Sequence, residues 1–132
     1  KYENYFDKVL LDAPCSGEGR FIATNAKTYM NWSIKTVKEL SKLQKKLLKS
    51  GYISLKNGGE IVYSTCTLNK EENENVLEWA ISELSLKLLN IDLQINGCIN
   101  AISENPEIKK AIRILPSKDN EGFFIARLKK CE

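Results

Sequence analysis

The chain has 132 residues, 42% of them hydrophobic, which is enough for one globular domain with a buried core. Because it contains no histidine, Ser-His, Cys-His and His-metal sites are excluded, and proton transfer near neutral pH must depend on carboxylates, thiols, lysine or water. The net charge of +3 says little about a nucleic-acid partner, because lysines on a helix face are usually solvated and only sometimes bind phosphate.

The first predicted element is a strand over residues 6–11, which ends at an acid, a proline and a thiol. Residues 9–17 read Val-Leu-Leu-Asp-Ala-Pro-Cys-Ser-Gly. The apolar run is typical of a strand covered on both faces, and ligands of open α/β sheets gather beyond the carboxyl ends of such strands. Pro14 cannot continue the strand, so it would hold Asp12 and Cys15 on a stiff turn beside a cleft. Taken singly, the two residues could equally be a loop-capping acid and a buried, unreactive thiol.

The loop that follows, residues 17–31, places Arg20 and Phe21 next to the predicted cleft. A guanidinium could hold phosphate there, and an aromatic ring could stack on a base. A solvent-exposed ion pair for Arg20 and core packing for Phe21 are at least as compatible with the sequence. Residues 17–19 read Gly-Glu-Gly, but Ile22 stands where a dinucleotide-binding fingerprint needs its third glycine, so that function is rejected.

The next predicted element is a long helix from Ser33 or Thr36 to about Leu55. Residues 36–39 have the form of a capping box, and apolar residues recur with helical spacing through the segment. Gly51 alone would favour an earlier end, but the helical spacing continues past it. The helix is therefore expected to end only at the Asn-Gly-Gly sequence that follows.

A second predicted strand ends in a thiol in the same way as the first. Residues 58–68 read Gly-Gly-Glu-Ile-Val-Tyr-Ser-Thr-Cys-Thr-Leu, which predicts a glycine turn, a strand over residues 60–64 and then Cys66. If both strands belong to one parallel sheet, their carboxyl ends lie at the same edge. Cys15, Cys66 and Asp12 would then face one crevice.

The rest of the chain continues the alternation of helix and strand patterns. The predicted elements are a helix from Asn69, capped with Glu72, to about Leu84, a strand over residues 85–93, a short helix over 106–112 and a last strand over 122–129. The stretch between residues 94 and 111 is polar and poorly patterned. The alternation predicts an α/β fold.

The two thiol-containing stretches together resemble a known family. DAPCSGEG (12–19) and YSTCTL (63–68), the latter followed by Glu-Glu-Asn-Glu (71–74), are similar to the two signature motifs of the Fmu/Sun family of RNA cytosine-C5 methyltransferases, and residues 114–128 resemble that family's last strand. The motifs occur in the family's order. The resemblance implies the second half of a class I, Rossmann-like methyltransferase fold, with a mostly parallel sheet, an antiparallel last strand and helices on both faces.

The resemblance also implies a reaction, the S-adenosylmethionine-dependent methylation of carbon 5 of cytosine in rRNA or tRNA. The family assigns the attacking thiolate to Cys66, which would add to carbon 6 of the base, and gives Cys15 a role in product release. Asp12 would hold N3 and the amino edge of the base and compensate charge as the ring is attacked.

Further contacts follow from the same resemblance. Asp12 and Pro14 would contact S-adenosylmethionine, and the RNA would be contacted by Ser16, Gly17, Arg20 and Thr65. The four cysteines (15, 66, 98 and 131) form no C-x-x-C pair, so neither a metal site nor a disulfide framework is expected, and a reducing cytoplasm is the expected location. Thiol redox chemistry is the weakest alternative for the same reason.

The chain lacks the glycine-rich turn and the acids with which class I methyltransferases bind their cofactor, and it starts at Lys1. Residues 1–132 are therefore expected to be the C-terminal half of a methyltransferase catalytic domain, whose cofactor-binding first half is absent. Strand 6–11 would then have an unpaired edge, which predicts pairing with the missing half or self-association. The alternative is a noncatalytic fragment that contacts RNA or a protein partner.

Overall fold

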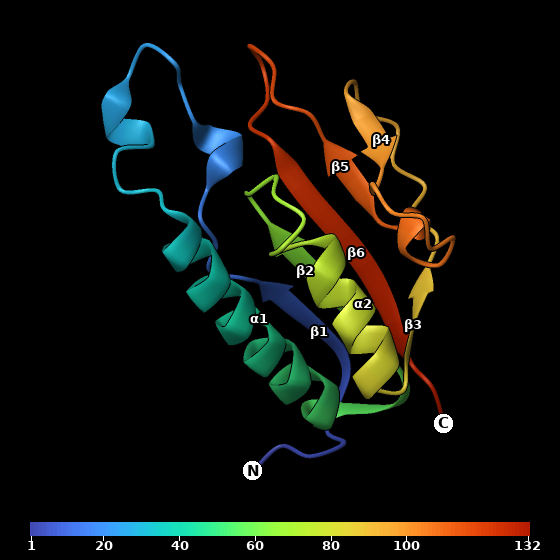
Figure 1. The fold of residues 1–132 in the computed structure, drawn as a ribbon. Helices are drawn as coiled ribbons and strands as arrows, with labels where there is room; N and C mark the ends of the chain where they lie inside the picture. Colours follow the sequence, from blue (N-terminus) through green and yellow to red (C-terminus); the bar gives the residue numbers. More distant parts are fainter.

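The computed structural model describes residues 1–132 as one sheet with two long helices packed against it (Figure 1). The strands are β1 (Phe6–Asp12), β2 (Leu55–Thr65), β3 (Leu86–Leu89), β4 (Cys98–Asn100), β5 (Ile112–Ile114) and β6 (Phe123–Lys130); the helices are α1 (Ile34–Ser54) and α2 (Glu74–Glu83). Three single 3₁₀ turns, η1 (Glu18–Arg20), η2 (Ala26–Thr28) and η3 (Ile108–Lys110), lie in the connections. Neither long helix combines the length and apolarity needed to span a bilayer.

Strand β6 lies inside the sheet although it is the last strand of the chain. The strand order is β1-β2-β6-β5-β4. β3 also pairs with β6: it contacts residues 127–130, whereas β5 contacts residues 123–125. β1 and β2 are parallel, whereas β6 is antiparallel to β2, β3 and β5. β1, β2, β3 and β5 therefore run in one direction, and β6 runs against them, as does the short strand β4, which is antiparallel to β5. This confirms the predicted α/β fold with its antiparallel last strand.

One face of the sheet carries the core. Ile61 and Tyr63 of β2 are completely buried, with the half-buried Val62 between them, and Phe124, Ala126 and Leu128 of β6 are completely buried at alternate positions. They pack with apolar residues of both helices, among them Leu48, Leu77 and Ala80. This period-two burial is what a sheet covered on one side produces.

The prediction of helices on both faces is wrong for this chain, because α1 and α2 cover the same face (Figure 1). The connections β1-α1-β2 and β2-α2-β3 both step across the sheet in the same direction. Right-handed crossovers that step the same way place their helices on the same side. The opposite face is open: Leu10 of β1 is 75% exposed, so the apolar run at residues 9–11 is not covered on both faces.

Helix α1 begins and ends within a residue or two of the predicted boundaries. Ser33 is the N-cap, and its Oγ accepts the N–H of Thr36 at 3.1 Å. Gly51 stays within the helix because it lies against β2: a Cβ there would be 2.6 Å from Cδ1 of Ile61. The Asn-Gly-Gly sequence at 57–59 is not a turn but an irregular part of β2, where the register with β1 shifts.

Three-residue strands account for most of what the sequence analysis missed. β4 and β5 pair with each other and extend the sheet beyond β6, within and after the stretch that had no pattern. The predicted helix over 106–112 is only the 3₁₀ turn η3, and the strand predicted over 85–93 is limited to β3. The middle residue of β5, Arg113, is charged although it is only 3% exposed. The sequence of this buried strand is therefore not uniformly apolar.

Candidate active site

The carboxyl ends of β1 and β2 form one edge of the sheet, and each is followed by a loop that carries a thiol. Asp12 and Ser64 are register partners at this edge, and Ser64 Oγ donates to Asp12 Oδ1 at 2.9 Å. Cys15 Sγ lies 3.2 Å from Cys66 Sγ and accepts the Cys66 N–H at 3.3 Å. The structure thus brings Asp12, Cys15 and Cys66 to one edge of the sheet.

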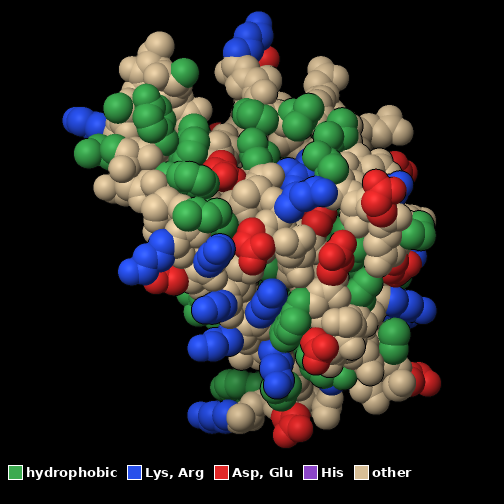
Figure 2. Space-filling model, viewed as in Figure 1, with side chains coloured by type: hydrophobic (Ala, Val, Ile, Leu, Met, Phe, Trp, Pro, Cys, Tyr) green, Lys and Arg blue, Asp and Glu red, His purple; other side chains and the backbone are tan.

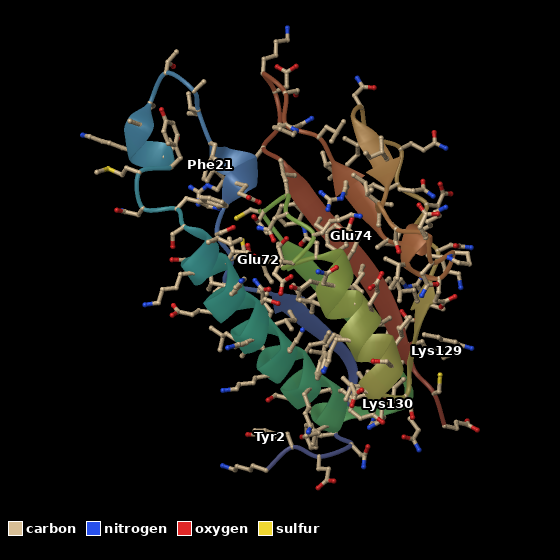
Figure 3. The ribbon with its side chains drawn as sticks, viewed as in Figure 1. Tyr2, Phe21, Glu72, Glu74, Lys129 and Lys130 are labelled. Carbon is tan, nitrogen blue, oxygen red and sulfur yellow. The ribbon has the colours of Figure 1, made fainter.

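A cavity of about 350 Å³ opens beside the two thiols and is lined by Cys15, Ser16, Gly17, Arg20, Thr28 and Cys66. A neighbouring cavity of about 250 Å³ shares Cys15, Ser16 and Thr28 with it and is bounded by Phe21 and Trp32. In Figure 3, Phe21 lies on the loop above α1, and Glu72 lies near the first turns of α1 and α2. A larger hollow of about 730 Å³ lies at the other end of β1, is lined by residues 4–8 and Lys56, and contains no thiol.

The surroundings of Cys15 disfavour its thiolate form. Burial raises the pKa of the Cys15 thiol to about 12, and the hydrogen bond with Cys66 adds to the shift. Cys15 is therefore protonated at neutral pH and can act as a hydrogen-bond donor, whereas a nucleophile must be a thiolate.

The raised pKa of Cys15 predicts a pH dependence of stability. The folded state holds this proton more tightly than the unfolded chain, in which a thiol has a pKa near 9.0, so the stabilisation is complete below pH 9 and is lost as the pH rises toward about 12. Urea midpoints of wild type and Cys15→Ala should therefore converge as the pH rises from 8 to 11. Parallel midpoints over that range would contradict the assignment, and comparison in identical buffers cancels the titration of the lysines.

The substrate residues predicted from the sequence occupy different positions around the cavity. Ser16, Gly17 and Arg20 line it, and Gly17 has a φ of 72°, which favours glycine. Thr65 is completely buried, and its hydroxyl donates to Asn73 Oδ1 at 2.6 Å, so it lies beneath the cavity and not on its wall. Pro14 is exposed beside Cys15.

Two carboxylates join the thiol-bearing loops, and sequence reasoning assigned neither of them to the site. Glu72 was recognised as part of the 71–74 stretch and as the capping partner of Asn69, whose Oδ1 does accept the Glu72 N–H at 2.9 Å. Its side chain reaches the other loop at Ser16, and Glu18 of that loop reaches back to Asn69. No local spacing signals such contacts, since they join residues about fifty positions apart in the sequence.

A close crossing of two glycines ties the site to the start of β6. Gly19 N–H donates to the Cys66 carbonyl at 2.9 Å, and Gly122 N–H donates to the Gly19 carbonyl at 2.8 Å. A Cβ on Gly19 would lie 2.2 Å from the Gly122 carbonyl oxygen. Only a residue without a side chain fits there.

We therefore expect Gly19→Ala to destabilise the fold by about 1–3 kcal/mol, the usual cost of overpacking a close contact. Urea denaturation monitored by circular dichroism measures this change. Ser50→Ala, at an exposed position of α1, serves as the control and should stay within about 0.5 kcal/mol of wild type. A Gly19 variant as stable as the Ser50 variant would show that the crossing is not tight.

The fold defines a class, because a solved methyltransferase homolog shares it. A structure described as a methyltransferase homolog protein from Pyrococcus horikoshii is similar to 95% of the chain, with a TM-score of 0.79 and 37% identity, and the chain covers 39% of it. The structure of NSun6 from Pyrococcus horikoshii with SFG is similar over 93% of the chain, with a TM-score of 0.74 and 33% identity, and the chain covers 29% of it.

Residues 1–129 match the family described as 16S rRNA methyltransferase RsmB/F, and the chain belongs to this family. It is 43% identical to the tRNA (cytosine(49)-C(5))-methyltransferase of Pyrococcus abyssi over 98% of its length and 38% identical to ribosomal RNA small subunit methyltransferase F of Klebsiella pneumoniae over 95%. The chain spans 43% and 26% of the lengths of these two relatives. The family resemblance of the two thiol motifs is thereby confirmed.

Proposed function

We propose that the protein containing this chain transfers a methyl group from S-adenosylmethionine to carbon 5 of a cytosine in rRNA or tRNA, through a covalent adduct between Cys66 and carbon 6. The observation that carries this proposal is the 3.2 Å separation of the two sulfur atoms, beside Asp12 at the carboxyl ends of β1 and β2. The names of the relatives, one a tRNA and one an rRNA methyltransferase, support RNA as the substrate class.

Cys66 provides the nucleophile in this proposal. Carbon 5 of cytosine is a poor nucleophile until the Cys66 thiolate bonds to carbon 6, which makes carbon 5 electron-rich. Asp12 hydrogen-bonds N3 and the amino edge of the ring, where charge changes during the attack. S-adenosylmethionine supplies the methyl group that carbon 5 takes up. Loss of the carbon 5 proton to a base then restores the double bond and releases Cys66 as a thiolate.

Cys15 acts at the release step. Its protonated sulfur lies 3.2 Å from the sulfur of Cys66 and can donate a hydrogen bond to the departing thiolate. A thiolate that accepts a hydrogen bond is a better leaving group, because its developing charge is stabilised. Without that donor the adduct would break down slowly.

Basic residues near the site are suited to pair with the phosphates of an RNA backbone. Six lysines, at positions 35, 38, 42, 45, 46 and 49, belong to α1, and Figure 2 shows Lys and Arg side chains gathered along this helix. Apolar side chains gather over the loop above α1, which contains Phe21 (Figure 2). A basic track beside exposed rings is what single-stranded RNA requires, since phosphates pair with cations and bases stack on rings.

The cofactor has only a partial site in this chain. Asp12 and Pro14 are exposed at the end of β1, whose outer edge has no strand partner in the chain, so a carboxylate and a proline are free to contact a ligand there. The chemistry of this small donor set fits one end of S-adenosylmethionine, and the relative solved with SFG, an analogue of that compound, supports its use.

Because so few contacts are available, we expect residues 1–132 alone to bind S-adenosylmethionine more weakly than micromolar. Isothermal calorimetry on the purified chain measures this. A dissociation constant near 1 μM, equivalent to about −8 kcal/mol, would contradict the prediction.

The proposed reaction itself is tested on the complete protein with RNA in which 5-fluorocytidine replaces cytidine. Fluorine cannot leave as a proton does, so the adduct should be trapped and migrate as a protein–RNA band on a denaturing gel. Formation of the band should require S-adenosylmethionine to be present. Methyl transfer without a trapped band would refute the covalent mechanism.

A further inference from the structure

We propose that Glu18 and Glu72 are positioning residues that hold the two thiol loops together and so set the distance between Cys15 and Cys66. This inference rests on the proposed function, because it assigns the two carboxylates to the release step. Neither thiol lies within a helix or strand. Something outside the strands must therefore fix the thiol loops, defined as residues 13–19 after β1 and residues 66–73 after β2.

Glu72 reaches from the second thiol loop to the first. Its Oε1 accepts the Ser16 N–H and Gln44 Nε2–H, each at 2.9 Å. Its Oε2 accepts the Ser16 hydroxyl and Asn69 Nδ2–H, each at 2.5 Å. Ser16 directly follows Cys15, and Glu72 is completely buried. The backbone next to Cys15 is therefore held by a carboxylate of the opposite loop.

Glu18 reaches in the reverse direction, from the first thiol loop to the second. Its Oε2 accepts the backbone N–H groups of Leu68 at 3.2 Å and Asn69 at 2.7 Å, together with Asn69 Nδ2–H at 2.8 Å. It also accepts the hydroxyl of Thr67, the residue after Cys66, at 2.8 Å. Each loop thus holds the segment that adjoins the thiol of the other.

The chemistry of these contacts argues for positioning and not for packing. Neither Glu18 nor Glu72 is in an ion pair, so both charges are compensated by neutral hydrogen-bond donors alone. Burying a carboxylate is costly, and an apolar side chain of similar size would join the loops at a lower cost. A carboxylate adds direction, because several donors must point at its two oxygens at once.

The test compares Glu72→Gln and Glu18→Gln with Glu71→Gln in the complete protein. Glu71 is the neighbour of Glu72, and its carboxylate contacts only the exposed side chain of Asn75, so it is a matched control. A neutral amide presents a donor where the pocket already supplies donors, which loosens the loops without removing bulk. We expect kcat to fall about 10–100-fold for Glu72→Gln and Glu18→Gln, as small misplacements of reacting groups do, while KM for RNA stays within about threefold.

The positional role predicts a second effect, an increased fraction of covalent protein–RNA adduct on a denaturing gel with ordinary RNA, because Cys15 would be displaced from the departing sulfur. Loss of activity that only follows the loss of folded protein, measured by circular dichroism, would show a merely structural role. Wild-type kcat in both variants would also overturn the proposal. If Glu72→Gln does not fold, the Glu18→Gln variant alone tests the positioning role, because Glu18 is only partly buried.

A third measurement separates this inference from the proposed function. Diamide oxidises two adjacent thiols to a disulfide and takes up their two electrons and two protons, and the rate depends on how closely the sulfurs are held. In the wild type we expect the Cys15–Cys66 disulfide, detected by mass spectrometry of unreduced peptides, to form at least about tenfold faster than in the two variants. Equal rates would refute the positioning role. If the wild type shows no methyl transfer but still forms the disulfide faster than the two variants, the proposed function alone is refuted.

Discussion

Replacing Cys66 with alanine in the complete protein is expected to abolish methyl transfer, whereas replacing Cys15 with alanine should leave a stalled covalent adduct with RNA. Without the Cys66 sulfur no bond to carbon 6 can form, and loss of a nucleophile typically lowers kcat by more than about 10⁴-fold. Without Cys15 the bond forms, but the departing sulfur loses the hydrogen-bond donor that lies 3.2 Å away.

The two variants are distinguished by methyl transfer from labelled S-adenosylmethionine and by a denaturing gel that shows protein bound to RNA. Cys98→Ala is the control, because Cys98 lies on β4, away from the paired thiols, and should behave as wild type. A protein–RNA band that persists in Cys66→Ala and disappears in Cys15→Ala would reverse the two assignments.

The largest effect on stability is expected for Arg113→Met. Arg113 donates to both oxygens of Glu74, from Nε at 2.7 Å and from Nη2 at 2.5 Å, and Nη1 donates to the Leu68 carbonyl at 2.5 Å. The two side chains are 4% and 1% exposed. Removing the guanidinium leaves a buried carboxylate without its cation, which typically costs about 3–5 kcal/mol of unfolding free energy.

A second ion pair of the same sheet provides the control for this measurement. Arg127 pairs with Glu60 through two hydrogen bonds of 3.0 Å, but the two side chains are 44% and 25% exposed. Arg127→Met should therefore cost no more than about 1 kcal/mol, as exposed pairs do. Urea denaturation of both variants decides the question, and equal losses would show that burial of the Arg113 pair has no special effect.

Much of the candidate site's geometry could be predicted from the sequence because its main parts are local. Asp12, Cys15 and Cys66 directly follow apolar runs, and the ends of parallel strands meet at one edge whatever the rest of the fold does. The resemblance of the two motifs to RNA cytosine-C5 methyltransferases agrees with the match of residues 1–129 to the RsmB/F family.

The rest depended on contacts that no local pattern encodes. Glu18 and Glu72 contact residues of the opposite loop. Both lie in the stretches that resemble the family motifs, but their neighbours in the sequence suggested no contact between the loops, and only a rejected fingerprint and a helix cap as local structure. The side of the sheet that carries α1 and α2 follows from strand order, which could not be read from the alternation of elements. β5 escaped prediction because it is short and contains the buried Arg113.

The position of β6 between β2 and its other neighbours has a consequence for synthesis of the protein. The segments before residue 123 can form helices and pair β1 with β2 and β4 with β5, but β2 keeps a bare edge, and neither β3 nor the β4–β5 pair can join the sheet until β6 arrives. The same arrival brings Gly122 against Gly19 beside the Cys66 loop. Chains on the ribosome therefore hold an incomplete sheet until β6 has left the exit tunnel, and the thiol pair takes its final geometry only after that point.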